Sequence, residues 1–209
     1  MAPAGSEKAG LDAQELQHLA LKAMNEDRAE DALRLLKRAV AQQPDNGWLY
    51  YLLGALHAEL GMIERSVEEM TRATQLSPEL GIARFQLGLM HMARGDVAKA
   101  QDVWVPLDQL DEHDALRVFK QGMVHFLHGQ DEDAIALLKR GIALNQAGEA
   151  LNRSMQRVIE QIHAEVAGQE AAAAAASMAS QPSPKADPGE EKQSVSAELQ
   201  HVLLANYRK

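Results

Sequence analysis

The sequence predicts an all-α protein built from four consecutive helix–turn–helix repeats. The chain resembles itself at an interval of 34 residues, its apolar residues recur at the spacing of a helix face, and glycine or aspartate marks each expected turn. No segment shows the alternation of apolar and polar residues that a strand would give. A fixed repeat of this length is typical of arrays in which each unit packs on its neighbours.

The four repeats become visible when the chain is divided into residues 13–46, 47–80, 81–114 and 115–148. Small residues then form two aligned columns in mid-helix, where they let a neighbouring helix approach. A third column lies at the turn, where glycine tolerates a positive φ. The columns are Ala20, Gly54, Gly88 and Gly122; Ala32, Ser66, Ala100 and Ala134; and Asp27, Gly61, Gly95 and Gly129.

The second helix of the third repeat contains Pro106, within the stretch VWVPLDQL. An interior proline removes a backbone hydrogen bond and costs about 3 kcal/mol in an ordinary helix. We therefore expect this helix to be shortened or kinked, which places an irregularity between the third and fourth repeats.

Four further segments flank the repeats. Residues 1–12 are expected to be disordered. Residues 149–168 carry one apolar stripe and are expected to form a helix that caps the array and stops near Gly168. Residues 169–193 offer little to bury and are expected to form a disordered linker, whose alanines can prolong the capping helix by a turn or two. Residues 194–209 are expected to form an amphipathic helical motif.

The repeats resemble the tetratricopeptide repeat (TPR). The stretches that carry the resemblance are YLLGALHAELG, FQLGLMHMARG and FKQGMVHFLHG, each followed by a second helix, and the likeness extends from Ala13 to about Gly148. The resemblance implies a superhelix of four helix pairs plus a capping helix. It also implies a protein-binding role, although the fold alone does not name the partner.

In the TPR family the first helix of each pair lines a concave groove. Carrying that pattern over to this chain gives a groove rich in aromatic residues and methionine, which we expect to bind an apolar helix or peptide of a partner protein. A position in the core is the alternative for each aromatic residue. The predicted groove residues are Trp48, Tyr51, Ile82, Phe85, Leu89, Met92, Leu116, Phe119, Met123 and Phe126.

Composition excludes several other classes of function. The net charge is −9 with no basic stripe, which argues against nucleic-acid binding. No apolar run reaches about 18 residues, so no membrane insertion is expected. The first residues contain no apolar signal region, and a cytoplasmic location is therefore expected.

No catalytic or metal site is predicted, and the chain is not expected to be an enzyme or to carry a cofactor. His57, His91 and His125 recur at one position of the repeat, where we expect a large residue packed between the two helices. Histidines on three stacked helices would lie too far apart for zinc bonds of about 2 Å. The chain has no cysteine, so it offers no thiol nucleophile.

Residues 194–209 place several apolar side chains on one helical face: Val195, Leu199, Val202, Leu203 and Tyr207. A helix of about 14 residues is marginal by itself, so this motif should order only when it is docked. Two hypotheses follow. In the first, the motif covers the groove of its own or a neighbouring chain until a partner displaces it. In the second, another protein binds the motif and the groove binds something else.

The function predicted from the sequence is that of a protein–protein interaction adaptor or chaperone that holds an apolar segment of its partner. One alternative is a bacterial secretion-type TPR chaperone, whose known members are also small, acidic and apolar in the groove. The other alternative is a regulatory subunit of an enzyme complex, docked through residues 194–209.

Overall fold

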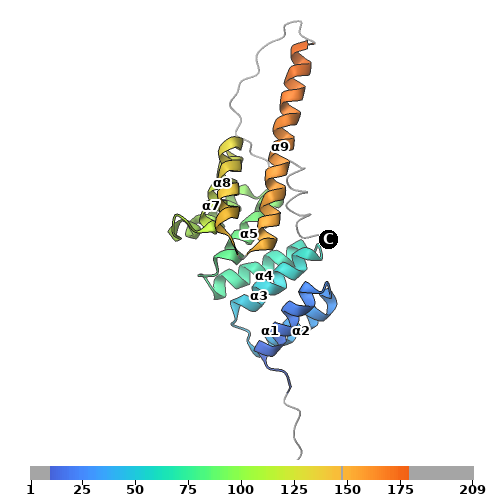
Figure 1. The fold of residues 1–209 in the computed structure, drawn as a ribbon. Helices are drawn as coiled ribbons and strands as arrows, with labels where there is room; N and C mark the ends of the chain where they lie inside the picture. Colours follow the sequence, from blue (N-terminus) through green and yellow to red (C-terminus); the bar gives the residue numbers. More distant parts are fainter. Residues whose placement is uncertain (1–9, 147, 179–209) are drawn as a thin grey trace, which may run out of the picture. The chain divides into compact units, whose positions relative to one another are not determined.

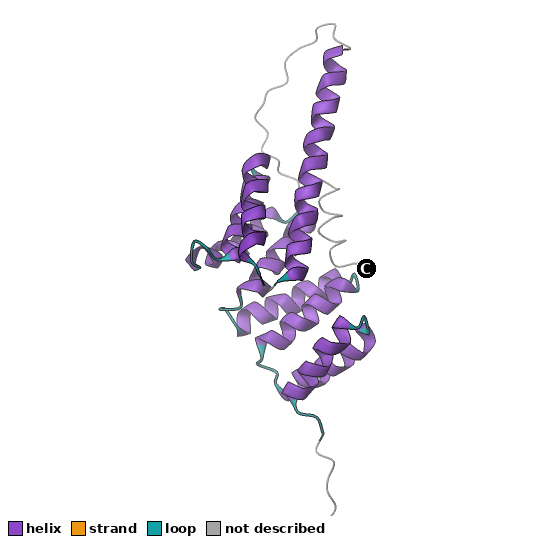
Figure 2. Cartoon of the chain, viewed as in Figure 1, coloured by secondary structure: helices purple, strands orange, loops and turns teal. Residues whose placement is uncertain are grey.

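The structure is a computed structural model that describes residues 10–146 and 148–178. The described residues form α-helices and one short 3-10 helix, with no β-strand among them (Figure 2). This confirms the prediction of an all-α fold of helix–turn–helix repeats. Residues 1–9 and 179–209, and with them the predicted helical motif at 194–209, lie outside the described residues.

Successive helices pair through short turns (Figure 1). Contacts are most numerous between α1 and α2, between α3 and α4 and between α7 and α8, which are the two helices of one repeat in each case. The helices are α1 (Ala13–Asn25), α2 (Ala29–Gln42), α3 (Gly47–Glu59), α4 (Ile63–Leu76), α5 (Gly81–Ala93), α6 (Val97–Trp104), the 3-10 helix η1 (Val105–Gln109), α7 (Ala115–Leu127), α8 (Asp131–Leu144) and α9 (Glu149–Met178).

The helix boundaries repeat with the spacing seen in the sequence. The first helices of the repeats and α9 begin at Ala13, Gly47, Gly81, Ala115 and Glu149, a constant interval of 34 residues. The turn column also behaves as expected, because all four of its members have a positive φ: Asp27 at 56°, Gly61 at 72°, Gly95 at 80° and Gly129 at 72°.

Side-chain caps fix the starts of α1, α3 and α7, each of which is the first helix of its repeat. Asp12 and Glu15 form a capping box on α1, with the Glu15 amide donating to Asp12 at 2.8 Å and the Asp12 amide donating to Glu15 at 2.9 Å. Asn46 accepts from the Trp48 amide at 3.1 Å, and Asp114 accepts from the Leu116 amide at 2.8 Å. Each cap satisfies an amide that the first helical turn leaves unpaired.

The chain divides into two compact units, residues 1–83 and 84–209, and the division falls in the first turn of α5. In the first unit, helices α1, α2 and α3 share one apolar core. Small side chains on α1 and α2 let the helices approach, and leucines fill the space between them. The core residues are Leu16, Ala20, Ala23, Ala32, Leu36, Ala39, Leu49, Leu52, Leu53 and Leu56.

The core of the second unit contains Trp104, which the sequence analysis did not single out. Its indole is fully buried, stacks on Phe85 with ring centroids 5.6 Å apart, and donates from Nε1 to the Phe85 carbonyl oxygen at 2.9 Å. Phe119 also lies beside Phe85, at a centroid distance of 5.9 Å. Trp104 therefore buries its large ring without leaving its single donor unsatisfied.

Pro106 has the expected effect on the third repeat. Helix α6 ends at Trp104 after eight residues, and the chain continues as η1 with Pro106 in its first turn. Two polar contacts join this irregular segment to α7. Lys120 donates to Asp108 at 2.7 Å, and Arg117 donates to the Leu110 carbonyl oxygen at 2.6 Å.

Helix α9 extends further than the sequence suggested. It continues to Met178, ten residues beyond the expected end at Gly168 and into the segment expected to be a linker. Alanine has the highest helix propensity, so the run of alanines that begins at Ala171 continues the helix once it has been nucleated.

The three histidines in register each lie near a carboxylate. His57 is buried and its Nδ1 lies 2.5 Å from Glu69 on α4. The corresponding distances are 4.0 Å from His91 to Asp96 and 3.9 Å from His125 to Asp133, both too long for a hydrogen bond. Of the three, only His57 is buried and hydrogen-bonded to an acid, whereas His91 and His125 are half-buried.

We predict that Gly88→Ala destabilises the second unit. A Cβ at Gly88 would overlap the indole of Trp104, which is held by stacking and by its hydrogen bond. Overpacking of this kind costs roughly 1–3 kcal/mol. Urea unfolding followed by the fluorescence of Trp104 measures the change. Gly168→Ala is the control, because a Cβ there meets nothing within 4 Å and should stabilise α9 slightly. Equal effects of the two substitutions would contradict the prediction.

We also predict a pH dependence that arises from His91. Burial lowers the pKa of His91 below its ordinary value of 6.5, and Lys99 and Arg94 act in the same direction while Asp96 opposes them. Below about pH 6.5 the unfolded chain therefore binds this proton more readily than the folded chain, and the free energy of unfolding falls as the pH falls.

His91→Gln removes the titrating group, so the stability difference between the wild type and this variant should shrink as the pH is lowered from 7 to 5. Denaturant titrations at several pH values measure it. His113→Gln, at an exposed position, is the control. A difference that stays constant with pH would contradict the prediction.

Candidate protein-binding surface

The ten residues predicted to line a groove differ widely in burial. Trp48 is 36% exposed, and Tyr51, Ile82 and Leu116 are half-buried. The other six side chains are buried: Phe85, Leu89, Met92, Phe119, Met123 and Phe126. In this structure the six buried side chains are part of the interior. Their role in partner binding stays a prediction.

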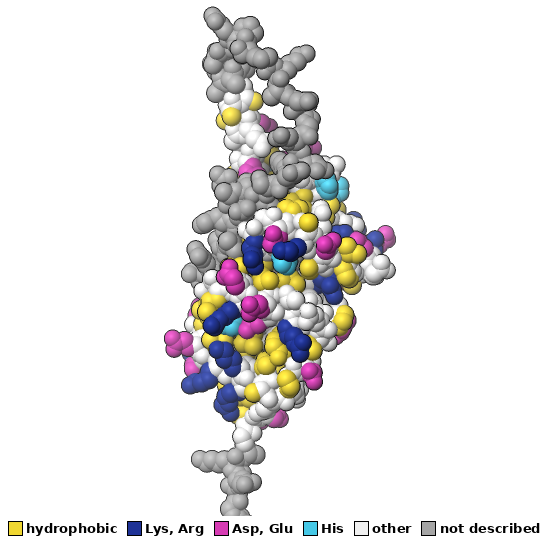
Figure 3. All heavy atoms as spheres, turned by 180° about the vertical axis from the view of Figure 1, so that it is seen from behind, with side chains coloured by type: hydrophobic (Ala, Val, Ile, Leu, Met, Phe, Trp, Pro, Cys, Tyr) yellow, Lys and Arg dark blue, Asp and Glu magenta, His cyan; other side chains and the backbone are white. Residues whose placement is uncertain are grey.

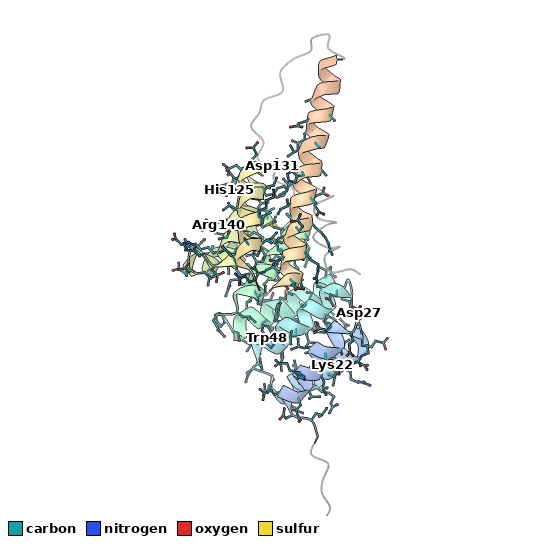
Figure 4. All side chains as sticks on the ribbon, in the orientation of Figure 1. Lys22, Asp27, Trp48, His125, Asp131 and Arg140 are labelled. Atoms are coloured by element: carbon teal, nitrogen blue, oxygen red, sulfur yellow. The ribbon has the colours of Figure 1, made fainter. Side chains whose placement is uncertain are left out.

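The accessible aromatic surface lies on the first unit. Trp48 and Tyr51 stand one turn apart on α3, with ring centroids 5.0 Å apart and planes inclined at 40° (Figure 4). Leu21 and Met24 of α1 occupy the repeat positions of the predicted groove residues Leu89 and Met92, and both are half-buried against the core of this unit, as Tyr51 is. We call Leu21, Met24, Trp48 and Tyr51 the Trp48 face.

Local packing fixes the place of Trp48. Gly47 precedes it, and a Cβ at Gly47 would lie 2.8 Å from the carbonyl oxygen of Ala73 and 2.5 Å from the Ser77 hydroxyl. Only glycine lets the start of α3 come this close to the end of α4. With the Asn46 cap on the Trp48 amide, this contact holds the backbone of the first turn, and the indole projects from a rigid element.

The buried aromatic residues of the second unit have a different environment. Phe119 occupies the space beside Gly141, where a Cβ would overlap its ring. Phe85 is stacked on Trp104.

A signal for Trp104 was present in the sequence. One repeat position carries a large apolar residue in every repeat, and all four of these residues are fully buried: Leu36, Met70, Trp104 and Leu138.

The described residues show no group of three histidine, aspartate or glutamate side chains placed to hold a metal ion. Nor does any helix in the described part of the chain have the length and apolarity to cross a membrane. Figure 3 shows basic and acidic side chains among hydrophobic ones on one face of the molecule.

Several solved structures are similar to this fold. The crystal structure of MamA has 19% sequence identity, covers 64% of this chain and 78% of that chain, and gives a TM-score of 0.52. MamA from residue 41 to the end, from Desulfovibrio magneticus RS-1, has 17% identity, coverages of 81% and 97%, and a TM-score of 0.52. A chain of the APC/C hetero-tetramer Cut9–Hcn1 has 17% identity, coverages of 82% and 33%, and a TM-score of 0.64. At these identities the likeness concerns the fold alone.

The sequence itself matches a family model. Residues 23–79, from the last turn of α1 to just beyond α4, match the model described as Tetratricopeptide repeat. No curated protein matches the sequence significantly. The match includes Met24, Trp48 and Tyr51 of the Trp48 face, and the 34-residue spacing of the helices continues beyond it to the start of α9. Residues 23–79 therefore match the tetratricopeptide repeat, and the described helices have the fold of a tetratricopeptide-repeat superhelix.

Proposed function

We propose that the chain is a protein-interaction scaffold whose Trp48 face binds an apolar segment of a partner protein. The observation that supports this most directly is the exposed Trp48–Tyr51 pair on the first helix of the second repeat. TPR folds are typical interaction scaffolds, and the described residues contain no metal cluster that would favour a different chemistry.

The chemistry of the Trp48 face suits protein binding. Tryptophan and tyrosine bring large apolar areas with a polar edge, and they are enriched among the residues that dominate binding energy at interfaces. Both are held on a helix with a capped start, so little conformational entropy is lost when a partner covers them. Met24 and Leu21 add flexible apolar contact, which can adapt to the shape of the bound segment.

The burial of the phenylalanines of the predicted groove supports placing the contact on the Trp48 face. Phe85 and Phe119 are fully buried in their own core, and exposing them would break the stacking on Trp104. Tyr51 occupies the same repeat position as these two phenylalanines but is half-buried, and Trp48 beside it is exposed. The first unit therefore offers aromatic contact without any rearrangement. A chaperone role and a cytoplasmic location stay predictions.

Replacing Trp48 and Tyr51 by alanine should remove partner binding. Truncation of interface hot spots costs at least about 2 kcal/mol, which weakens affinity about 30-fold. The full-length chain and its Trp48→Ala/Tyr51→Ala variant are immobilised and used to capture proteins from an extract. A protein captured by the wild type and lost with the variant is then titrated in purified form.

Leu60→Ala is the matched control. Leu60 is apolar and 46% exposed, and it caps the C-terminal end of α3, whereas Trp48 lies in the first turn of that helix. The control should retain the partner. Equal retention by all three proteins, or equal loss from both variants, would argue against the Trp48 face as the binding surface.

The two tryptophans allow a direct optical test. Trp48 is exposed and Trp104 is fully buried, so acrylamide should quench the emission of Trp48 and spare that of Trp104. A bound partner should shield Trp48 and reduce the quenched fraction. Trp48→Phe should abolish most of the quenching in the free protein. If the quenching stayed unchanged at a saturating concentration of the partner, the partner would have to bind at another surface of the protein.

A further inference from the structure

The first helix of the second repeat has one face that a neighbouring helix covers. Leu49, Leu52, Leu53 and Leu56 of α3 are at most 4% exposed, and they share a core with Ala32, Leu36 and Ala39 of α2. Contacts between α2 and α3 confirm this packing. In a stacked array, the second helix of one repeat thus covers the first helix of the next.

Helix α1 has an equivalent face, and no helix among the described residues covers it. The equivalent positions, 34 residues earlier, are Glu15, His18, Leu19 and Lys22, and all four are exposed. The contrast is clearest at Leu19, which is 37% exposed, whereas Leu53 and Leu87 at the same repeat position are 4% and 3% exposed.

A pocket of about 500 Å³ lies on this side of α1, lined by Leu11, Gln14, Glu15, His18 and Leu19. We call these residues, together with Lys22, the α1 outer face. It is apolar at Leu11 and Leu19, with the charge of Glu15 between them and that of Lys22 beyond Leu19, unlike the leucine-lined face of α3. A helix that covers it must bring an apolar stripe flanked by complementary charges.

We propose that residues 194–209 of the chain dock as a helix on the α1 outer face, in the place that α2 takes on α3. The apolar spacing of the two segments supports this. Helix α2 carries Ala32, Leu35 and Leu36 at intervals of three and one, and the segment carries Leu199, Val202 and Leu203 at the same intervals. Val195 and Tyr207 extend the stripe by a turn on each side.

Charge complementarity fixes the direction. Consecutive helices joined by a short turn run antiparallel, as α2 and α3 do (Figure 1). A segment antiparallel to α1 brings Glu198 near Lys22 and brings Arg208 and Lys209 near Glu15. Among the described residues, Lys22 forms a long, exposed ion pair with Glu26, at 3.9 Å, which a stronger partner can replace. A parallel segment would place like charges together instead.

The other segment outside the described residues is a poorer candidate. Residues 1–9, MAPAGSEKA, contain Met1 as their only large apolar residue and cannot supply a stripe. The Trp48 face is also a poorer place for residues 194–209, because Glu15, His18, Leu19 and Lys22 of the α1 outer face correspond to α3 leucines that share a core with α2, and no residue of the Trp48 face corresponds to such a leucine. The inference does not rest on the proposed function, since the two faces share no residue.

Disulfide trapping tests the docking in the full-length chain, which has no cysteine of its own. The variant Leu19→Cys/Leu203→Cys is oxidised mildly and its cross-linking is followed on non-reducing gels. A disulfide needs the two Cβ atoms within about 4.5 Å, so a docked segment should be trapped about tenfold faster than a randomly colliding one. A cross-linked monomer shows docking within one chain, and a cross-linked dimer shows docking on a second copy. Either form supports the proposal.

Two matched pairs decide between the alternatives. Leu60→Cys/Leu203→Cys reports random collision, because Leu60 is as exposed as Leu19 but lies outside both faces. Trp48→Cys/Leu203→Cys reports occupation of the Trp48 face. Equal trapping at positions 19 and 60 would overturn the proposal, and so would faster trapping at position 48 than at position 19.

A charge exchange tests the direction of the segment. Lys22→Glu in the Leu19→Cys/Leu203→Cys background should slow trapping several-fold, and adding Glu198→Lys should restore it. Lys99→Glu, which reverses an exposed charge on α6, should leave trapping unchanged. Failure of Glu198→Lys to restore trapping would overturn the antiparallel arrangement.

Discussion

The packing of a small residue against a large one, between the two helices of each repeat, is the constraint on which the rest of the structure depends. In the second repeat, a Cβ at Gly54 would lie 2.7 Å from Met70, and in the fourth, a Cβ at Gly122 would lie 3.0 Å from Leu138. In the third repeat the large residue is Trp104, and Gly88 is in contact with its indole. One column holds the small residues and the other holds the large residues that fill the space beside them. The two helices of a repeat can therefore approach closely.

This packing determines which side chains remain for other uses. The large residue of the second helix fills the interior of the repeat, so aromatic residues on the first helix are free to project elsewhere. In the first unit Trp48 does so, and Tyr51 stays half-buried beside it. In the second unit the interior is built differently: Trp104 offers a flat ring for stacking, and Gly141 leaves space that Phe119 fills. For these reasons Phe85 and Phe119 are buried in the core.

The sequence was sufficient to predict the repeat, the turns and the helix starts, because each depends on local chemistry. Glycine at a positive φ, a capping aspartate and a proline that ends α6 act within a few residues. The burial of Phe85 and Phe119 was not predictable from their repeat position, since Tyr51 shares it. It depends on Trp104 and Gly141, which lie about 20 residues further along the chain. The continuation of α9 past Gly168 depends on local chemistry instead. The helix propensity of the alanines outweighs the cost of one glycine, so the helix does not stop there.

The ends of a repeat array meet a requirement that its interior does not. An interior helix is covered on both sides and can be leucine-rich, as α3 is, whereas an end helix must face water. Helix α1 resolves this with Glu15, His18 and Lys22 at positions where α3 has leucine, yet it keeps Leu19. Such a face is stable without a cover, and its exposed leucine gains about 1.5–3 kcal/mol if a helix buries it fully. A segment tethered to the same chain competes for this position better than a free one, because the tether gives it a high effective concentration.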